Sequence, residues 1–152
     1  MHLADHLLPE HISIDLSSGT KFQIIEELIQ VLNQNKVLDD ADLALQDVLA
    51  REGYLSTGLE SGLAIPHAKT DGVSDLQIAL GIKKEGVDFE SLDGKPANLI
   101  FLVLSPRNTS GPHIRTLAVI TRNLKEREIR TAMLKAQTVQ EVASIIKNKF
   151  SL

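Results

Sequence analysis

The sequence predicts a single α/β domain, and three observations support this prediction. Strand-like apolar segments take turns along the chain with segments that repeat apolar residues at helical spacing. The 152 residues are enough for one hydrophobic core and contain no repeat, linker or low-complexity stretch. Aliphatic side chains must supply that core, because the chain has four Phe, one Tyr and no Trp. We therefore expect one domain over residues 1–152.

The chain begins with a short turn and a strand. Residues Leu3–Leu7 predict a helical turn that Pro9 closes. Ile12, Ile14 and Leu16 then alternate with polar residues, a pattern typical of a half-buried strand.

Two helices follow. The first is predicted over Thr20–Asn33, where Thr20 and Gln23 form a capping box. The second begins after Asp39 or Asp40 and ends near Arg51-Glu52-Gly53. Their expected inward residues are Phe22, Ile25, Leu28, Ile29 and Leu32 in the first helix and Ala41, Leu45, Val48 and Leu49 in the second.

Three strands occupy the middle of the chain. The first is Leu63–Ile65. The second, Leu76–Ile82, alternates large apolar residues with small or polar ones and is followed by a turn at Asp93-Gly94. The third, Leu99–Leu104, is continuously apolar, which predicts a central strand covered on both faces.

The last third of the chain predicts three helices. Pro112 fits the first position of one helix, a second covers Glu126–Ala136, and Thr138 with Glu141 caps the last. The expected inward residues are Ile114, Leu117, Ala118, Thr121 and Leu124, then Ile129, Ala132 and Met133, and finally Val142, Ile145 and Ile146.

The composition of the chain argues against several classes of function. The absence of cysteine excludes disulfides, thiolate catalysis and Cys-type zinc sites. A net charge of −4 without a basic run argues against a nucleic-acid partner. No apolar segment approaches the roughly 20 residues of a membrane span, and the N-terminus lacks the pattern of a signal peptide. A cytoplasmic protein is expected.

The stretch Ser56–Ala68 is the strongest candidate for a functional site. It passes from small hydroxyl residues into the strand Leu63–Ile65, and Pro66, which has no N–H for a ladder hydrogen bond, should end that strand. His67 would then stand at a rim beside the small Ala68. An imidazole titrates near neutrality, so its free nitrogen can act as nucleophile, base or metal ligand.

His113 is the second candidate. It follows Pro112 in the first turn of a helix, where free N–H groups and the helix dipole favour a neutral imidazole and attract anions. His67 and His113 each follow a proline beyond the end of an apolar run, and parallel strands bring such ends to one edge of a sheet. Spacing alone favours two unrelated surface histidines, because such pairs arise by chance.

Other charged residues have ordinary explanations. Arg51 is either a cation at a helix C-terminus, which is a common placement, or a guanidinium aimed at a phosphate. His2 and His6 have the spacing of a metal clamp, with His11 nearby, but a mobile N-terminus favours solvated side chains.

Together these residues resemble the phosphorylation-site signature of enzyme IIA, mannitol/fructose type, of the bacterial phosphoenolpyruvate-dependent phosphotransferase system. That group includes the nitrogen-regulatory enzyme IIA. The resemblance covers nearly the whole chain and outweighs the alternatives above. It is carried by Arg51-Glu52, Ser56-Thr57-Gly58, Leu63-Ala64-Ile65-Pro66-His67-Ala68, His113, Leu117-Ala118, Arg130, Leu134 and Ala136. Glu60 departs from it, because the signature has glycine or alanine there.

The resemblance implies a mixed β-sheet with helices on both faces. It implies that His67 accepts a phosphoryl group from a histidine phosphocarrier protein and passes it to an enzyme IIB of a sugar permease, so that contact with a membrane is indirect. Arg51, Ser56, Thr57 and His113 would hold the phosphoryl oxygens, since phosphoryl transfer needs mainly an in-line nucleophile and charge stabilisation. Neither a metal nor a nucleotide cofactor is expected.

Two other functions stay open as alternatives. In the first, the domain is a regulatory module whose phosphorylation alters its binding to target proteins, as in nitrogen regulation. In the second, the two histidines bind a metal.

Overall fold

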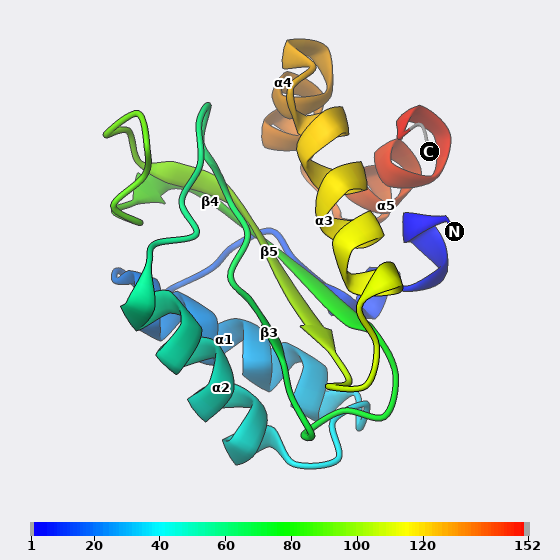
Figure 1. Ribbon diagram of the computed structural model, residues 1–152. Coiled ribbons are helices and arrows are strands. Elements are labelled where there is room, and N and C mark those ends of the chain that lie inside the picture. Colours follow the sequence, from blue (N-terminus) through cyan, green and yellow to red (C-terminus); the bar gives the residue numbers. More distant parts are fainter. Residues whose placement is uncertain (1, 151–152) are drawn as a thin grey trace.

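A computed structural model describes residues 2–150 (Figure 1). Its strands are β1 (Ile12–Ser13), β2 (Leu63–Ala64), β3 (His67–Lys69), β4 (Gln77–Val87) and β5 (Ala97–Ser105). Its helices are α1 (Lys21–Gln34), α2 (Ala41–Tyr54), α3 (Gly111–Leu124), α4 (Arg127–Lys135) and α5 (Val139–Lys149), with 3₁₀ turns at Leu3–Asp5 and Pro9–His11. Within residues 2–150, no helix has both the length and the apolar composition needed to cross a membrane.

The strands form one mixed sheet, as expected. Its order is β1-β4-β5-β2, and β3 continues beside β5 on the same side as β2. The long strands β4 and β5 are antiparallel, whereas β1 runs parallel to β4 and both β2 and β3 run parallel to β5. The register pairs His67 with Val103, near the C-terminal end of β5.

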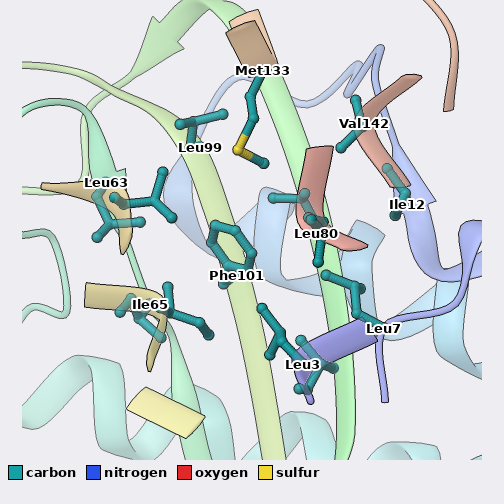
Figure 2. Close-up of a cluster of buried hydrophobic side chains, with 14 of the residues drawn as sticks. Leu3, Leu7, Ile12, Leu63, Ile65, Leu80, Leu99, Phe101, Met133 and Val142 are labelled. Carbon is teal, nitrogen blue, oxygen red and sulfur yellow. The ribbon is translucent and has the colours of Figure 1, made fainter. Parts of the chain in front are cut away.

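Helices cover both faces of the sheet. Helices α1 and α2 pack on one face, and α3, α4 and α5 lie on the other together with the N-terminal turns (Figure 1). Side chains of β5 are buried on both faces, which confirms the predicted central strand. Figure 2 shows part of the core between the sheet and α4 and α5, where Met133 points toward Phe101 and Val142 lies beside Ile12.

The predicted caps explain where three helices begin. Thr20 accepts a hydrogen bond from the backbone N–H of Gln23 at 3.3 Å and so starts α1. Asp40, not Asp39, caps α2 by accepting from Leu43 at 3.0 Å. Thr138 caps α5 by accepting from Glu141 at 3.1 Å. Each side chain satisfies a backbone donor that the helix itself cannot.

The N-terminal prediction was wrong in two respects. Pro9 begins a second 3₁₀ turn instead of closing the first. The terminus is also anchored: Leu3 and Leu7 are buried in the core, as Figure 2 shows. The first strand is shorter than expected because, beyond Ser13, the chain leaves the ladder and Leu16 packs into the core on the opposite face of the sheet.

Two helix faces are also rotated from the prediction. Phe22 is exposed because Lys21 takes the inward position at the start of α1. In α3, Ile114 is 63% exposed and Ala118 faces solvent, while His113, Thr116 and the residues one turn further on are buried. Polar residues therefore occupy part of the inner face of α3, which an apolar pattern does not reveal.

Candidate active site

His67 lies within a strand that resumes after Pro66. The proline interrupts the ladder between β2 and β3. His67 was predicted to lie just beyond the end of a strand, but it is the first residue of β3. Its Nδ1 lies 2.7 Å from the carbonyl oxygen of Ile65. A carbonyl oxygen can only accept, so Nδ1 carries a proton, and in the neutral ring the lone pair is on Nε2.

The surroundings of His67 favour its neutral form. Burial lowers the pKa of His67, the hydrogen bond to Ile65 opposes that change, nearby Arg51 lowers the pKa further and Glu52 raises it. The balance is a pKa below the usual value of 6.5. At neutral pH the ring is uncharged, and Nε2 can act as a nucleophile.

His113 lies beside His67, as the family resemblance implied, although spacing alone had favoured two unrelated surface histidines. The ring centroids are 5.4 Å apart and the ring planes are tilted by 58°. Burial, reinforced by His67 and Lys69, lowers the pKa of His113 to about 4. The imidazole is therefore neutral at physiological pH. Its Nδ1 lies 2.7 Å from the hydroxyl oxygen of the buried Ser105, the last residue of β5.

A cavity of about 400 Å³ opens in front of His67. Its walls come from the end of α2, the following loop, the loop after β4, and α3; they include Arg51, Gly58, Ile65, Glu90, Leu117 and Thr121. Leu55 and Leu92 also line it and are 64% and 77% exposed. His67 and Arg51 thus lie in a hollow with an apolar rim.

Arg51, which precedes Glu52 in the sequence, lines this cavity. Its Nη1 donates to the carbonyl oxygen of Leu55 at 2.6 Å, which closes the end of α2. Glu52 points instead into the protein, where it is 2% exposed. A guanidinium has five N–H donors, so Arg51 can donate to other acceptors while it keeps the hydrogen bond to Leu55.

Ser56 and Thr57 were expected to donate their hydroxyls to phosphoryl oxygens, but in this structure both hydroxyls donate to other acceptors. The Ser56 hydroxyl donates to the carbonyl oxygen of Phe89, and the Thr57 hydroxyl donates to the carboxylate of Glu52. A hydroxyl has one proton, so in this arrangement neither has a proton for another acceptor. Both residues line the cavity, where they hold its wall together.

Gly58 fits the same wall tightly. A Cβ atom at this position would lie 2.6 Å from the Ser91 hydroxyl oxygen and 2.9 Å from the Phe89 carbonyl oxygen. The loop after β4 can therefore approach the Ser56–Gly58 segment closely because residue 58 has no side chain.

Glu60 lies outside the cavity of His67. It is exposed and lines a neighbouring hollow with Lys125 and Arg130. The left-handed backbone in this turn falls on Ser61 (φ 59°) and Gly62 (φ 79°), not on Glu60. A glutamate at the usually small position is thus accommodated without a strained backbone, with its carboxylate at the rim.

Sequence reasoning missed four residues that surround the site. Ser105 contacts His113, and Lys69 lies two residues after His67 on β3, so strand alternation could have placed it on the same face. Lys21 forms an ion pair with Glu52 at 3.4 Å and another with Glu90 at 2.9 Å. No local pattern links Lys21 to carboxylates so distant in the sequence.

The N-terminal histidines lie apart from this site. His11 is buried in the second 3₁₀ turn, contrary to the expectation of solvated side chains, and burial lowers its pKa. Among residues 2–150, no cluster of three or more His, Cys, Asp or Glu residues has the geometry of a metal site.

Comparison with known sequences points to one family. Residues 5–149 match the family described as "Phosphoenolpyruvate-dependent sugar phosphotransferase system, EIIA 2". The PTS system fructose-specific EIIA component of Haloferax volcanii is 37% identical over 137 residues, which are 90% of this chain and 89% of that protein. The fructose-specific EIIABC component of Bacillus subtilis is 36% identical over 146 residues, and this chain spans 23% of its length.

A solved structure agrees with this assignment. The nitrogen regulatory protein IIA-Ntr of Neisseria meningitidis matches with a TM-score of 0.83 and 30% identity, covering 95% of this chain and 98% of that one. Sequence and fold therefore lead to the same conclusion. The chain belongs to the EIIA 2 family of the phosphoenolpyruvate-dependent sugar phosphotransferase system.

Proposed function

We propose that this protein is a phosphoryl carrier in which Nε2 of His67 accepts a phosphoryl group from the histidine of a phosphocarrier protein and passes it to an enzyme IIB. The observation that carries the proposal is the hydrogen bond between His67 Nδ1 and the Ile65 carbonyl oxygen. It fixes the tautomer whose free nitrogen is Nε2, in a partly exposed ring beside a cavity.

The transfer balances without an added acid or base. The Nε2 lone pair of His67 forms a bond to phosphorus while the P–N bond to the donor histidine breaks, and the donor ring leaves with that electron pair. His67 retains its Nδ1 proton throughout, and the ring becomes formally cationic. The Ile65 carbonyl oxygen, already 2.7 Å from Nδ1, then stabilises the positive ring. No net proton movement is needed.

His113 and Arg51 are the groups we assign to the phosphoryl oxygens. If the Ser105 hydroxyl donates to His113 Nδ1, the His113 proton is on Nε2, where it serves as a hydrogen-bond donor. Arg51 contributes a permanent positive charge at the cavity in front of His67. Donors fixed before the reaction stabilise developing charge without having to reorganise. Ser56 and Thr57 support the wall behind them.

The apolar rim gives the partner a place to dock. Leu55, Leu92 and Ile114 are each more than 60% exposed, and the first two border the cavity itself. Coverage of this rim by a partner would exclude water from the labile phosphoramidate during transfer.

Similarity to IIA-Ntr supports a second candidate function. In it, the same phosphorylation of His67 acts as a switch, and the state of the histidine alters binding to a regulatory target. The two functions differ in whether the phosphoryl group moves on. Incubation of the phosphorylated protein with an enzyme IIB distinguishes them: loss of label from this protein to enzyme IIB indicates transport, and retention indicates regulation.

The proposal is tested by phosphorylation from phosphoenolpyruvate with enzyme I and the phosphocarrier protein. We expect the wild-type protein to take up one phosphoryl group that is stable to alkali and lost in acid. His67→Gln should take up none, whereas His11→Gln, a control at another histidine, should be labelled like the wild type. Full labelling of His67→Gln would contradict the proposal.

A further inference from the structure

Glu52 occupies a position that stability alone does not favour. It lies near the C-terminal end of α2, where the helix dipole disfavours negative charge, and it is 2% exposed. Burial of a carboxylate is unfavourable unless a counter-charge and hydrogen bonds compensate for the lost water.

The contacts of Glu52 join three segments of the chain. One carboxylate oxygen accepts from the backbone N–H of Thr57 at 2.9 Å, and the other accepts from the Thr57 hydroxyl. Lys21, at the start of α1, supplies the counter-charge at 3.4 Å. Lys21 also pairs with Glu90, in the loop after β4, at 2.9 Å.

Two hydrogen bonds, joined through the backbone of Ile65, link Thr57 to His67. The carbonyl oxygen of Thr57 accepts from the backbone N–H of Ile65 at 3.1 Å. The carbonyl oxygen of Ile65 then accepts from Nδ1 of His67 at 2.7 Å. The acceptor that fixes the tautomer of His67 therefore belongs to Ile65, which is anchored on the Thr57 carbonyl, and Glu52 anchors Thr57 through its N–H and its hydroxyl.

We propose that Glu52 is a positioning residue for His67, acting through Thr57 and the Ile65 carbonyl, with Lys21 as its counter-charge. The inference rests on the proposed role of His67 as phosphoryl acceptor. Outer hydrogen-bond partners orient reactive histidines in this way in metal sites, where their loss commonly reduces activity or affinity by about 10- to 100-fold. The negative charge of Glu52 also favours the positive ring that forms on transfer, in keeping with its tendency to raise the pKa of His67.

Glu52→Gln is the direct test. The glutamine keeps the size of the side chain and one carbonyl acceptor but loses the charge. Its NH₂ group must face either the Thr57 hydroxyl, which would have to turn and accept, or the Lys21 ammonium, which can only donate. We expect the maximal rate of phosphorylation to fall by about 10- to 100-fold with little change in the donor concentration needed for half-maximal rate. Nitrogen-15 NMR should show His67 losing its single Nδ1–H tautomer.

Glu27→Gln is the matched control. The Glu27 carboxylate likewise accepts from backbone N–H groups, those of Ser17 and Ser18 at 3.0–3.2 Å, but beyond β1, at the sheet edge away from His67. Glu27→Gln removes the same charge and the same kind of hydrogen bond as Glu52→Gln. It should leave both the rate of phosphorylation and the tautomer of His67 unchanged.

Thr57→Val provides a second variant if Glu52→Gln does not fold. It removes the hydrogen bond from the Thr57 hydroxyl to Glu52 and keeps the one from the backbone N–H. We therefore expect a smaller reduction in the rate of phosphorylation, in the same direction. A wild-type rate and an intact tautomer in a folded Glu52→Gln protein would overturn the inference. If the wild type itself is not phosphorylated at His67, the proposed function fails instead, and the two failures are distinct.

Discussion

The rings of His67 and His113 lie 5.4 Å apart, tilted by 58°, although one belongs to β3 and the other to α3. This placement suits His113 to donate to a phosphoryl group on His67 rather than to accept one. We predict that His113→Ala slows onward transfer from phospho-His67 by about 10²–10³, the usual loss for one preorganised donor. Single-turnover transfer to a partner measures this rate. Wild-type rates in both directions would remove His113 from the mechanism.

Arg51 is predicted to need its guanidinium and not only its charge. Its donor to the Leu55 carbonyl closes α2, and its other donors are available to a phosphoryl group in the cavity. Arg51→Lys keeps the charge but loses the planar fork, and should slow phosphorylation by about tenfold or more, given the strength of hydrogen bonds to charged groups.

A control for Arg51→Lys is Arg107→Lys. Arg107 pairs with Asp47 and Asp71 on the surface, so the same substitution there should leave single-turnover rates unchanged. Equal rates for wild type and Arg51→Lys would show that any cation suffices.

Stability should fall as the pH drops from 6.5 to about 4. Above pH 6.5 His113 is neutral in both folded and unfolded chains. Between that pH and the folded-state pKa of about 4, the unfolded chain binds a proton that the folded chain does not, so acid favours unfolding. His113 alone accounts for a loss on the order of 3 kcal/mol across this window.

Urea unfolding of the wild type and His113→Gln between pH 7.5 and 4.5 measures this contribution. Burial also lowers the pKa values of His67 and His11, so both proteins should weaken in acid. The variant should weaken less. An identical pH dependence in the two proteins would show that His113 is not held neutral by the fold.

Glu60 is predicted to act on partner association and not on chemistry. It is exposed and borders a hollow separate from that of His67. Glu60→Gln should slow phosphorylation by a basic donor surface about threefold at low ionic strength, and the difference should shrink as salt screens the charge. The lifetime of isolated phospho-His67 should not change. A longer lifetime without a salt-dependent rate would place the carboxylate against the phosphoryl group.

Much of the fold could be predicted from local patterns. The continuously apolar Leu99–Leu104 identified the central strand, and caps such as Thr20 and Thr138 located helix starts, because each depends on neighbours in sequence. The meeting of His67 and His113 was compatible with the direction of the strands, but only the family resemblance favoured it over two unrelated surface histidines.

The remaining differences come from contacts that no local pattern contains. Lys21 turns inward because two carboxylates distant in sequence, those of Glu52 and Glu90, neutralise its charge. Phe22 is left at the surface, and the Lys21 Nζ atom lies 5.3 Å from the centroid of its ring. Helix α3 is rotated so that His113 faces His67, which leaves Ile114 exposed. In both helices a polar contact overrides the apolar periodicity.

We assign the phosphoryl group to Nε2 of His67, because Nδ1 donates to the carbonyl oxygen of Ile65. Phosphorylation of nitrogen-15-histidine-labelled protein, followed by nitrogen-15 and phosphorus-31 NMR, identifies the phosphorylated atom directly. We expect a phosphorus–nitrogen coupling at Nε2 of His67, with Nδ1 still protonated. A coupling at Nδ1 of His67, or at His113, would contradict it.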